Sequence, residues 1–530
     1  MKNLGVMLDC SRGAVYTEAA IKKYIDALGR MGYNSLQLYT EDTILVEGEP
    51  YFGYLRGAYS IDEIRRIAEY AKTHGIELIP AVQTLAHLKG VTRWNVYSEI
   101  TDTGNILLMG DECTYRLIDN IFAACRKAYS TDRINIGMDE AYLVGRGKYA
   151  DVHGNSDRMA AMLDHLKRVC EIAEKYGFKP MMWSDMFFRI AGLDYYSDKR
   201  REFTKEVIDL VPKNLDLIYW DYYSCDYGIY DATIKTHKQF DNDIVFAGGA
   251  WCWSGITPHN KYSIRNNESA IKACKANGIE DIVITEWKDD GAESSLFSVL
   301  PALMFAAENY RGNFDENDIK TKFEKLFGIF CDGFMALDMP DLLDSEYTNA
   351  NPTKYMLFAD PFLGWLDSTV DITKSNAFEK AKGETDQYVS NNDYGYIFRT
   401  VSALCDVMSM KYTLGVRTRK AYKEKDVIAL NDLVKVYDEL YKRVETLYDA
   451  FTEQWNRECK FNGFEHHDAR YGNLLMRIKH CRAILKDYVS GKIKNIDALD
   501  EDILPFNDQF GNTVCYIPWV SNALIKYSDD

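Results

Sequence analysis

The feature that most constrains the fold is a unit that recurs over roughly the first 300 residues: a short apolar strand, a loop and an amphipathic helix. The eight candidate strands lie at residues 4–9, 35–40, 77–82, 133–139, 179–185, 216–222, 243–249 and 281–287. Most are nearly continuous hydrophobic runs, which is typical of parallel strands buried on both faces. An open doubly wound sheet usually has about five or six strands, so eight units predict a closed (β/α)8 barrel of the α/β class.

The helices predicted between these strands have recognisable ends. Residues 17–31 place apolar side chains on one face and are followed by Gly32, a residue that often ends a helix. Ser60 and Glu63 have the spacing of a capping box, which predicts the start of a second helix. Neither a GxGxxG nor a P-loop motif follows the first strand, which argues against a nucleotide-binding sheet.

Three regions are predicted along the chain. Residues 1–310 form the barrel, and residues 311–372, which contain two X-Pro pairs, are expected to be a turn-rich connecting segment. Residues 373–530 are predicted to form a helical C-terminal domain. The reason is that long stretches such as 427–455 repeat apolar residues at helical spacing while glycine is scarce.

Composition narrows the choice of partners and compartment. Lys and Arg number 63 against 80 Asp and Glu, so the net charge of −17 argues against a nucleic-acid surface. The sequence contains neither an apolar run of about 18 residues nor an N-terminal secretory signal. Twelve cysteines are scattered without a CxxC pair, which fits reduced thiols. We therefore expect a cytoplasmic protein without a nucleic-acid or membrane partner.

In barrels of this kind the chemistry takes place at the carboxyl ends of the strands and in the loops after them, here called the rim. The aromatic and ionisable rim residues are Asp9, Arg12, His87, Asp139, Glu140, Trp183, Asp185, Trp220, Asp221, Tyr222, Tyr223, Trp251, Trp253, Trp287, Asp289 and Asp290. They include five of the nine tryptophans in the chain. Because pyranose C–H faces pack on flat aromatic rings while sugar hydroxyls need polar partners, the rim predicts a sugar site.

The adjacent carboxylates Asp139 and Glu140 allow three interpretations. They are structural caps or ion-pair partners, ligands of a metal, or the acid and base that cleave a glycosidic bond. A metal site, as in a metal-dependent aldose isomerase or hydrolase, would draw on Asp9, His87, Asp139, Glu140, Asp185 and Asp221. A non-catalytic sugar-binding barrel would present the same aromatic rim.

Neighbouring residues on one strand do not easily flank a sugar from opposite faces, as the usual pair of glycosidase carboxylates does. A second mechanism removes this difficulty, because the 2-acetamido group of the substrate itself acts as the nucleophile. One carboxylate then orients the acetamido group, and its neighbour transfers the protons.

An ordered set of motifs fits that second mechanism. It comprises DCSR at 9–12, QTLAHL with His87, the Asp139-Glu140 pair, Trp183, YWDYY at 219–223 and WKDDG at 287–291. Together these resemble glycoside hydrolase family 20, the β-N-acetylhexosaminidases, over roughly residues 1–310. The segments PYFGYLRGAYS and GGAWCWSGITP are similar to its bacterial exo-acting branch.

The chain departs from this family in two places. Many members carry an α+β domain before the barrel, and none is expected here because the first strand begins at Leu4. The usual Gly-Gly-Asp-Glu sequence reads Gly137-Met138-Asp139-Glu140, so a methionine replaces the second glycine. This substitution affects the backbone beside the acid pair and leaves the carboxylates themselves in place.

The resemblance implies a retaining exo-β-N-acetylhexosaminidase that removes terminal non-reducing β-GlcNAc or β-GalNAc through an oxazolinium intermediate. It implies that Asp139 orients the acetamido group and that Glu140 serves as general acid and then as general base. No cofactor and no metal are implied. The expected partner is an oligosaccharide or glycoconjugate with a terminal β-linked N-acetylhexosamine, and the helical region is expected to be either a homodimer interface or a brace for the barrel.

The resemblance also implies roles for the other rim residues. Arg12 is expected to hold O3 and O4 of the sugar, and Asp289 to bind O4 or O6. The remaining expectations are Trp183 and Trp220 around the acetamide methyl, Tyr222 donating to the acetamide oxygen, Trp287 against the sugar face, and Trp251 and Trp253 near the next sugar. His87 is expected either to contact the substrate or to brace the site.

Overall fold

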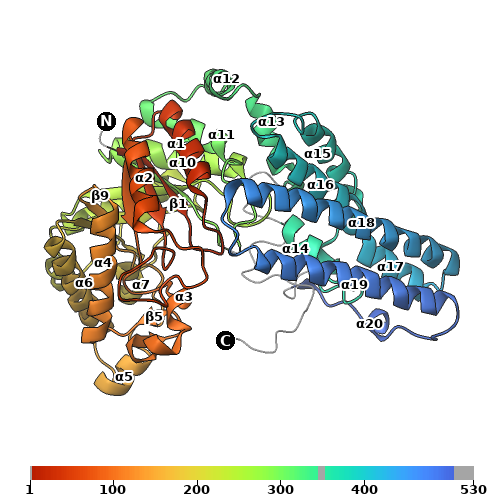
Figure 1. Cartoon of the computed structure of the whole chain (residues 1–530), viewed down its shortest axis with the longest axis horizontal. Helices are drawn as coiled ribbons and strands as arrows, with labels where there is room; N and C mark the ends of the chain where they lie inside the picture. The colour runs from red at the N-terminus through yellow and green to blue at the C-terminus, as the bar shows by residue number, and fades with distance from the viewer. Residues whose placement is uncertain (1–2, 290, 344–351, 507–530) are drawn as a thin grey trace.

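The computed structural model describes residues 3–289, 291–343 and 352–506, and a closed parallel barrel forms its N-terminal part (Figure 1). The strand order around the barrel is β1-β10-β9-β8-β7-β6-β3-β2. These strands are β1 (Asn3–Asp9), β2 (Ser35–Tyr39), β3 (Glu77–Ala81), β6 (Arg133–Asn135), β7 (Lys179–Trp183), β8 (Asp216–Trp220), β9 (Ile244–Gly249) and β10 (Asp281–Glu286). The predicted (β/α)8 barrel is therefore confirmed.

The barrel closes where its first and last strands pair in parallel, with Leu8 opposite Glu286. Every residue of β1 is buried, as expected for a strand covered on both faces. Strand β6 is shorter than predicted and ends at Asn135. The reason is that Gly137 and Met138 both have a φ of 73°, which is incompatible with extended backbone.

The barrel helices begin and end where the local sequence predicts. Helix α1 (Glu18–Met31) ends at Gly32, which adopts a φ of 83°. Helix α2 (Ile61–Thr73) begins with the predicted capping box, since Ser60 and Glu63 each accept a hydrogen bond from the other's backbone N–H. The other helices of this part are α3 (Lys89–Thr92), α4 (Glu112–Ala128), α5 (Lys148–His153), α6 (Arg158–Lys175), α7 (Asp185–Ala191), α8 (Lys205–Leu210), α9 (Tyr227–His237), α10 (Asn260–Ala276) and α11 (Leu300–Arg311).

The region predicted as a turn-rich connection, residues 311–372, contains helices of its own. They are α12 (Glu316–Phe327), α13 (Cys331–Met335) and α14 (Pro352–Phe358). Pro352 is the first residue of α14, a position where its missing N–H breaks no helical hydrogen bond. Helix α12 buries Ile319, Phe323 and Phe327, which recur every four residues along one face.

The C-terminal part is helical, as predicted, and its two longest helices run side by side away from the barrel (Figure 1). Its helices are α15 (Ala377–Asp386), α16 (Gly395–Lys411), α17 (Leu414–Lys423), α18 (Val427–Glu458), α19 (Glu465–Val489) and α20 (Asp497–Asp500). In the ranges that the structure describes, no helix is both long and apolar enough to cross a bilayer. The eleven described cysteines are free thiols, nine of them buried.

Candidate active site

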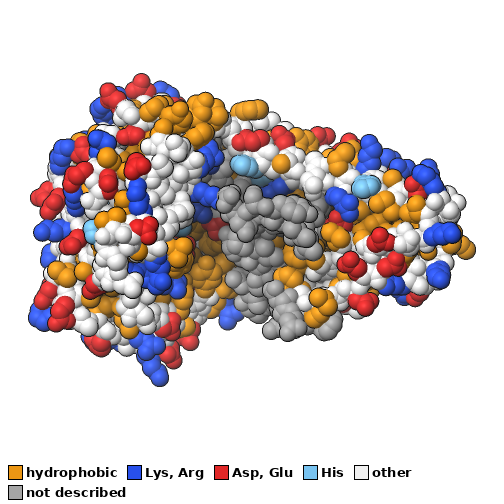
Figure 2. Space-filling model, turned by 90° about the horizontal axis from the view of Figure 1, so that it is seen from below, with side chains coloured by type: hydrophobic (Ala, Val, Ile, Leu, Met, Phe, Trp, Pro, Cys, Tyr) orange, Lys and Arg blue, Asp and Glu red, His pale blue; other side chains and the backbone are white. Residues whose placement is uncertain are grey.

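The rim of the barrel encloses a cavity with about 690 Å³ of empty space, part of it open to solvent. The rim loops lie on the lower side of the barrel in Figure 1, the side from which Figure 2 views the molecule. The cavity is lined by Arg12, His87, Asp139, Glu140, Trp183, Trp220, Tyr222, Tyr223, Trp253, Trp287 and Asp289. The fold thus brings together ten of the eleven side chains for which the resemblance implied a role.

The acid pair stands on a sharply turned loop after β6. Left-handed backbone at Gly137, Met138 and Glu140, with φ of 73°, 73° and 50°, redirects the chain at almost every residue. As a result the neighbouring carboxylates have different environments. The Asp139 side chain is 10% exposed, whereas the Glu140 side chain is 39% exposed. One carboxylate is therefore held inside the cavity wall and the other reaches solvent.

Asp139 is held from the β3 side of the barrel. Its Oδ1 accepts a hydrogen bond of 2.7 Å from Gln83 Nε2, and its Oδ2 lies 3.2 Å from His87 Nε2. Burial alone would raise the pKa of Asp139, but the positive charge of His87 and these polar contacts lower it below its usual value. Asp139 is therefore a carboxylate at neutral pH.

His87 is the cationic partner of this carboxylate. Burial alone would lower its pKa, but the Asp139 charge outweighs burial and raises the pKa to about 9. Its Nε2 also lies 3.7 Å from Oε2 of Glu140, so one imidazolium faces both members of the acid pair. The His87 backbone has a φ of 58°, which aims the ring from a tight turn.

Glu140 is fixed by its neighbours through both backbone and side chain. Its backbone N–H donates to Oδ2 of Asp185, at 3.1 Å, and its Oε1 accepts a 3.0 Å hydrogen bond from the Tyr142 hydroxyl. Burial and the nearby Asp139 charge raise the pKa of Asp185 to about 7. The carboxylate beside the acid pair thus titrates near neutral pH.

Aromatic rings form the walls of the cavity. Trp220 and Tyr222 stack at a centroid distance of 5.2 Å and an angle of 22°, and Trp183 lies 5.8 Å from Trp287. Although these rings border a cavity, each is less than 9% exposed, so neighbouring side chains fix their orientation. Rigid flat walls of this kind suit the apolar face and the methyl group of an N-acetylated sugar.

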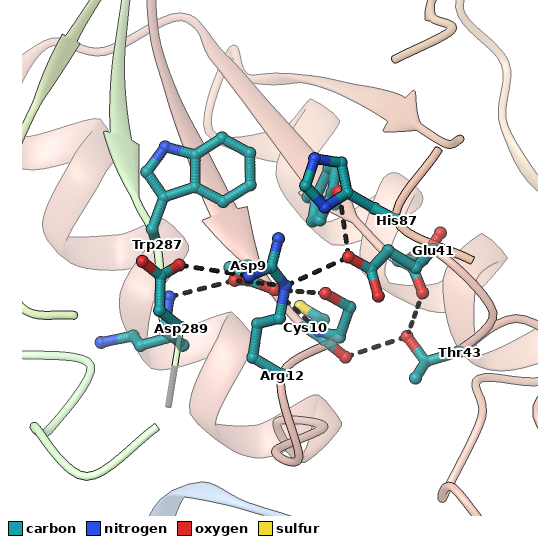
Figure 3. A network of polar contacts seen from close by, with 12 residues as sticks. Asp9, Cys10, Arg12, Glu41, Thr43, His87, Trp287 and Asp289 are labelled. Carbon is teal, nitrogen blue, oxygen red and sulfur yellow. Dashed lines mark hydrogen bonds and ion pairs between the residues drawn. The ribbon is translucent and has the colours of Figure 1, made fainter. Parts of the chain in front are cut away.

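A network of charged groups forms the opposite side of the cavity (Figure 3). Arg12 lies between two carboxylates, with its Nε 3.1 Å from Glu41 and its Nη1 3.3 Å from Asp289. Its guanidinium also lies 5.8 Å from the centre of the Trp287 ring. Burial raises the pKa of Asp289 to about 6, although Arg12 opposes this. The network offers both donors and acceptors to a hydroxylated ligand.

Two family models match the chain, one in each part of the fold. Residues 47–239 match the catalytic domain of glycosyl hydrolase family 20, and residues 332–515 match the glycoside hydrolase 20C C-terminal domain. The chain belongs to glycoside hydrolase family 20. The family assignment agrees with the resemblance seen in the rim motifs.

Curated relatives are distant. Human hexosaminidase D is 24% identical over 333 residues, which cover 56% of this chain and 64% of that protein. Bovine hexosaminidase D is 25% identical over 318 residues, which cover 54% of this chain and 88% of that protein. The chain thus spans less than two thirds of the human protein.

Solved structures are also similar to this chain. The β-N-acetylhexosaminidase of Bacteroides fragilis has a TM-score of 0.48 at 17% identity, covering 62% of this chain and 70% of that one. The family 20 enzyme of Streptomyces coelicolor has a TM-score of 0.45 at 16% identity, covering 61% and 69% respectively.

One nominated residue of this family 20 chain does not line the cavity. Trp251 is 2% exposed, stacks on Trp253 at 4.3 Å, and donates its indole N–H to the backbone oxygen of Tyr222. It therefore supports two cavity residues from behind. Asp290, which the sequence also placed at the rim, lies outside the described residues.

Sequence reasoning nominated neither Glu41 nor Gln83, which lies beside Asp139, as functional residues. Each stands two residues after a strand end, Tyr39 for Glu41 and Ala81 for Gln83, so the strand-end rule applied to every polar residue would have found both. Gln83 opens the QTLAHL motif, in which only His87 was assigned a role, and Glu41 belongs to none of the quoted motifs.

Other rim carboxylates serve the backbone. Asp9 accepts hydrogen bonds from the backbone N–H groups of Ser11 and Lys288, and Asp221 caps the turn that follows it. Among the residues that the structure describes, no group of three or more His, Cys, Asp or Glu side chains is arranged to hold a metal ion.

Proposed function

We propose that this family 20 chain is a retaining exo-β-N-acetylhexosaminidase that removes terminal β-linked GlcNAc or GalNAc. The observation that carries the proposal is the division of labour in the acid pair. Asp139 is buried and kept ionised by His87, while the adjacent Glu140 is 39% exposed in the same cavity. Substrate-assisted cleavage needs one carboxylate that stays ionised and one that exchanges protons with the leaving group and with water.

In the proposed first step, Asp139 accepts the N–H of the substrate's acetamido group and turns its carbonyl oxygen toward C1. The oxygen attacks C1 as the glycosidic bond breaks, which forms an oxazolinium ring. The negative charge of Asp139 stabilises the positive charge that develops on this ring. Trp183 and Trp220 enclose the acetamide methyl. The stacked rings of Trp220 and Tyr222 keep the acetamido group from rotating away from C1.

Glu140 performs the proton transfers in this proposal. In its protonated form it gives a proton to the leaving oxygen, and its carboxylate then takes a proton from the water that opens the oxazolinium. The partial exposure of its side chain gives the leaving group and the water access to it. Two inversions at C1 leave the β-configuration unchanged.

Recognition of the terminal sugar is assigned to the charged network of Arg12, Glu41 and Asp289, here called the Arg12 side of the cavity. Arg12 would donate to O3 and O4, Asp289 would accept from O4 or O6, and Trp287 would support the sugar face. Groups that satisfy the hydroxyls of the non-reducing end favour cleavage of a terminal residue, because an internal residue carries a further sugar at one of them. Location in the cytoplasm and assembly as a homodimer remain predictions.

Hydrolysis of aryl β-glycosides of GlcNAc, GalNAc, glucose and galactose, in the presence and absence of a chelator, tests the proposal. The two 2-acetamido substrates should be cleaved with retention and with no effect of the chelator, and the two 2-hydroxy substrates far more slowly. Equal rates on both classes would contradict the mechanism. Loss of activity with the chelator would favour a metal-dependent hydrolase. Tight binding of GlcNAc without cleavage would favour a non-catalytic sugar-binding barrel.

A further inference from the structure

The helical region contacts two barrel loops that carry the proposed sugar-reading residues. The loop after β1, residues 10–17, carries Arg12. The loop after β10, described at residues 287–289 and 291–299, carries Asp289. The connection between α18 and α19 with its flanking turns, residues 458–470, is here called the hairpin tip. It lies against the barrel (Figure 1) and makes hydrogen bonds to both loops.

His467 of the hairpin tip holds the β10 loop two residues after Asp289. Its Nε2 donates a hydrogen bond of 2.7 Å to the backbone oxygen of Gly291, and its side chain is buried. Three rings within 6 Å pack around the imidazole, those of Phe451, Trp455 and Phe464. Burial lowers the pKa of His467 to about 3, so the ring is a neutral donor at every pH of interest.

Glu293 anchors the same loop a second time. Its carboxylate lies 2.6 Å from Nζ of Lys354 and 3.1 Å from Nη1 of Arg470, and the Glu293 and Lys354 side chains are 4% and 1% exposed. Its backbone oxygen accepts a 3.1 Å hydrogen bond from the side-chain amide of Gln454. Helices α14, α18 and α19 therefore all bind one barrel residue.

Glu458 links the two loops to each other. Its Oε2 accepts a 2.7 Å hydrogen bond from the backbone N–H of Leu296, in the β10 loop. Its backbone oxygen accepts a 2.8 Å hydrogen bond from the backbone N–H of Thr17, at the end of the β1 loop. The loops that carry Arg12 and Asp289 thus share one support outside the barrel.

Gly463 brings the hairpin tip into direct contact with the Arg12 loop. A Cβ at this position would stand 1.6 Å from the backbone oxygen of Gly13, the residue after Arg12. Gly463 also has a φ of 100°, where residues with a side chain are strained. The close approach is thus possible only for glycine.

The acid pair is remote from this support in the barrel. In the strand order, β6 is separated from β1 by β2 and β3 on one side, and from β10 by β9, β8 and β7 on the other. The hairpin tip makes its hydrogen bonds to the β1 and β10 loops, and Arg12 is linked to Asp139 only indirectly, through a chain of hydrogen bonds by way of Glu41, Tyr39 and Gln83. A change at the hairpin tip should therefore act first on Arg12 and Asp289.

We propose that the hairpin tip is a positioning element for recognition of the sugar hydroxyls. His467 sets the place of Asp289, and Gly463 sets the place of Arg12; neither touches the substrate. The inference rests on the proposed function, because it assigns the two barrel residues to hydroxyl groups of the terminal sugar.

The test is a comparison of kcat/KM for an aryl β-GlcNAc and its 4-deoxy and 6-deoxy analogues. In the wild-type enzyme, loss of the hydroxyl that binds Asp289 should lower kcat/KM about 10-fold or more, the size of a charge-assisted hydrogen bond. In His467→Phe, which keeps a ring but loses the donor, this penalty should shrink to about 3-fold or less. His467→Gln restores an N–H donor, so most of the wild-type kcat/KM penalty for the deoxy substrate should return.

Controls separate positioning from general damage. His466→Phe makes the same exchange at an exposed neighbour and should behave as wild type. Circular dichroism melting of each variant identifies a temperature at which all are folded. The ratio of rates on good and poor leaving groups, which reports on Glu140, should be the same in His467→Phe and wild type.

Gly463→Ala tests the Arg12 loop independently of His467. It should shrink the penalty for removing the hydroxyl that Arg12 binds, measured with 3-deoxy and 4-deoxy substrates. An undiminished deoxy penalty in folded His467→Phe and Gly463→Ala would overturn the inference. If the wild-type chain cleaves no 2-acetamido glycoside, the proposed function fails, and the same comparison is made on calorimetric affinities for GlcNAc and its deoxy analogues.

Discussion

The two sides of the cavity differ in what holds them in place. The acid pair is supported by the barrel alone. Gln83 and His87, after β3, contact Asp139, and Asp185, after β7, binds the backbone of Glu140. These contacts join adjacent strands of one closed sheet, so they form whenever the barrel forms.

The Arg12 side is supported from outside the barrel. Its two loops are packed against α14, α18 and α19, through contacts that join residues more than 50 positions apart in the sequence. The comparison teaches that the groups proposed to break the bond and the groups proposed to bind the sugar hydroxyls have different supports, although Glu41, Tyr39 and Gln83 connect them. Changes in the helical region should alter which sugars are read, while changes near β3 and β6 should alter how fast any sugar is cleaved.

The largest expected effect is on the acid pair itself. Glu140→Gln should lower kcat on a poor leaving group by about 10²–10⁴-fold, because general acid catalysis is lost. The loss should be smaller on a leaving group that departs without a proton. Steady-state kinetics with a series of aryl leaving groups measures this, and full activity on the poor ones would reject the assignment.

Asp139→Asn keeps the shape of the side chain but removes the charge that stabilises the oxazolinium. The rate on 2-acetamido substrates should fall by at least about 10²-fold, the loss typical of one well-placed electrostatic group. Melting curves show whether the variant is folded. An unchanged rate would be incompatible with neighbouring-group attack.

The next largest effect is expected at the buried ion pair of Lys354 and Glu293. Lys354→Met removes one of two cations that face the buried Glu293 carboxylate. Because Arg470 remains 3.1 Å from Glu293, the loss of folding free energy should not exceed the about 3–5 kcal/mol that breaking a buried ion pair costs. Urea unfolding measures the loss, with Lys380→Met, on an exposed lysine, as the control. The kcat/KM penalty for deoxy substrates should shrink in the same variant. A stability equal to that of the control would show that the ion pair does not anchor the β10 loop.

A smaller, pH-dependent effect is expected at His87. His87→Gln removes the cation that lowers the pKa of Asp139, so the acid limb of the kcat/KM profile should move to higher pH. Because the folded-state pKa of His87 is raised to about 9, its ion pair stabilises the fold fully below its unfolded value of about 6.5.

The stability difference between wild type and His87→Gln should therefore be largest at about pH 6 and shrink as the pH rises through about 9. Urea unfolding at several pH values measures this difference. A difference that stays constant from pH 6 to pH 10 would mean that His87 is not charged in the folded protein.

The barrel was predictable because its information is local and repeated. Each strand is a short apolar run, and ends such as Gly32 and the Ser60 capping box are set by neighbours in sequence. The cavity residues were predictable because functional residues of such barrels lie at the carboxyl ends of the strands, and strand ends can be located in the sequence alone. Trp251 shows the limit of that rule, since the sequence gives its position on a loop but not the direction of its ring.

The support of the Arg12 side was not predictable from the sequence. His467 and Gly463 lie in an unremarkable turn, and their partners Gly291 and Gly13 are reached only through the folded backbone. The sequence left open whether the helical region is a brace or a dimer interface. Long-range contacts of this kind carry no periodicity that a single sequence could reveal.

The smallest expected effect is on the folding stability of variants at Met138, which distinguish backbone strain from side-chain packing in the acid-pair loop. Met138 is fully buried and has a φ of 73°, a conformation that costs a side-chain-bearing residue about 1–2 kcal/mol. Met138→Ala and Met138→Gly both remove the packing, but only glycine removes the strain. The glycine variant should therefore be about 1 kcal/mol more stable than the alanine variant in urea unfolding. An alanine variant that is equally stable would mean that the loop has relaxed. Deoxy-substrate ratios that stay unchanged in both variants would show that the acid-pair loop does not set the place of Arg12 and Asp289.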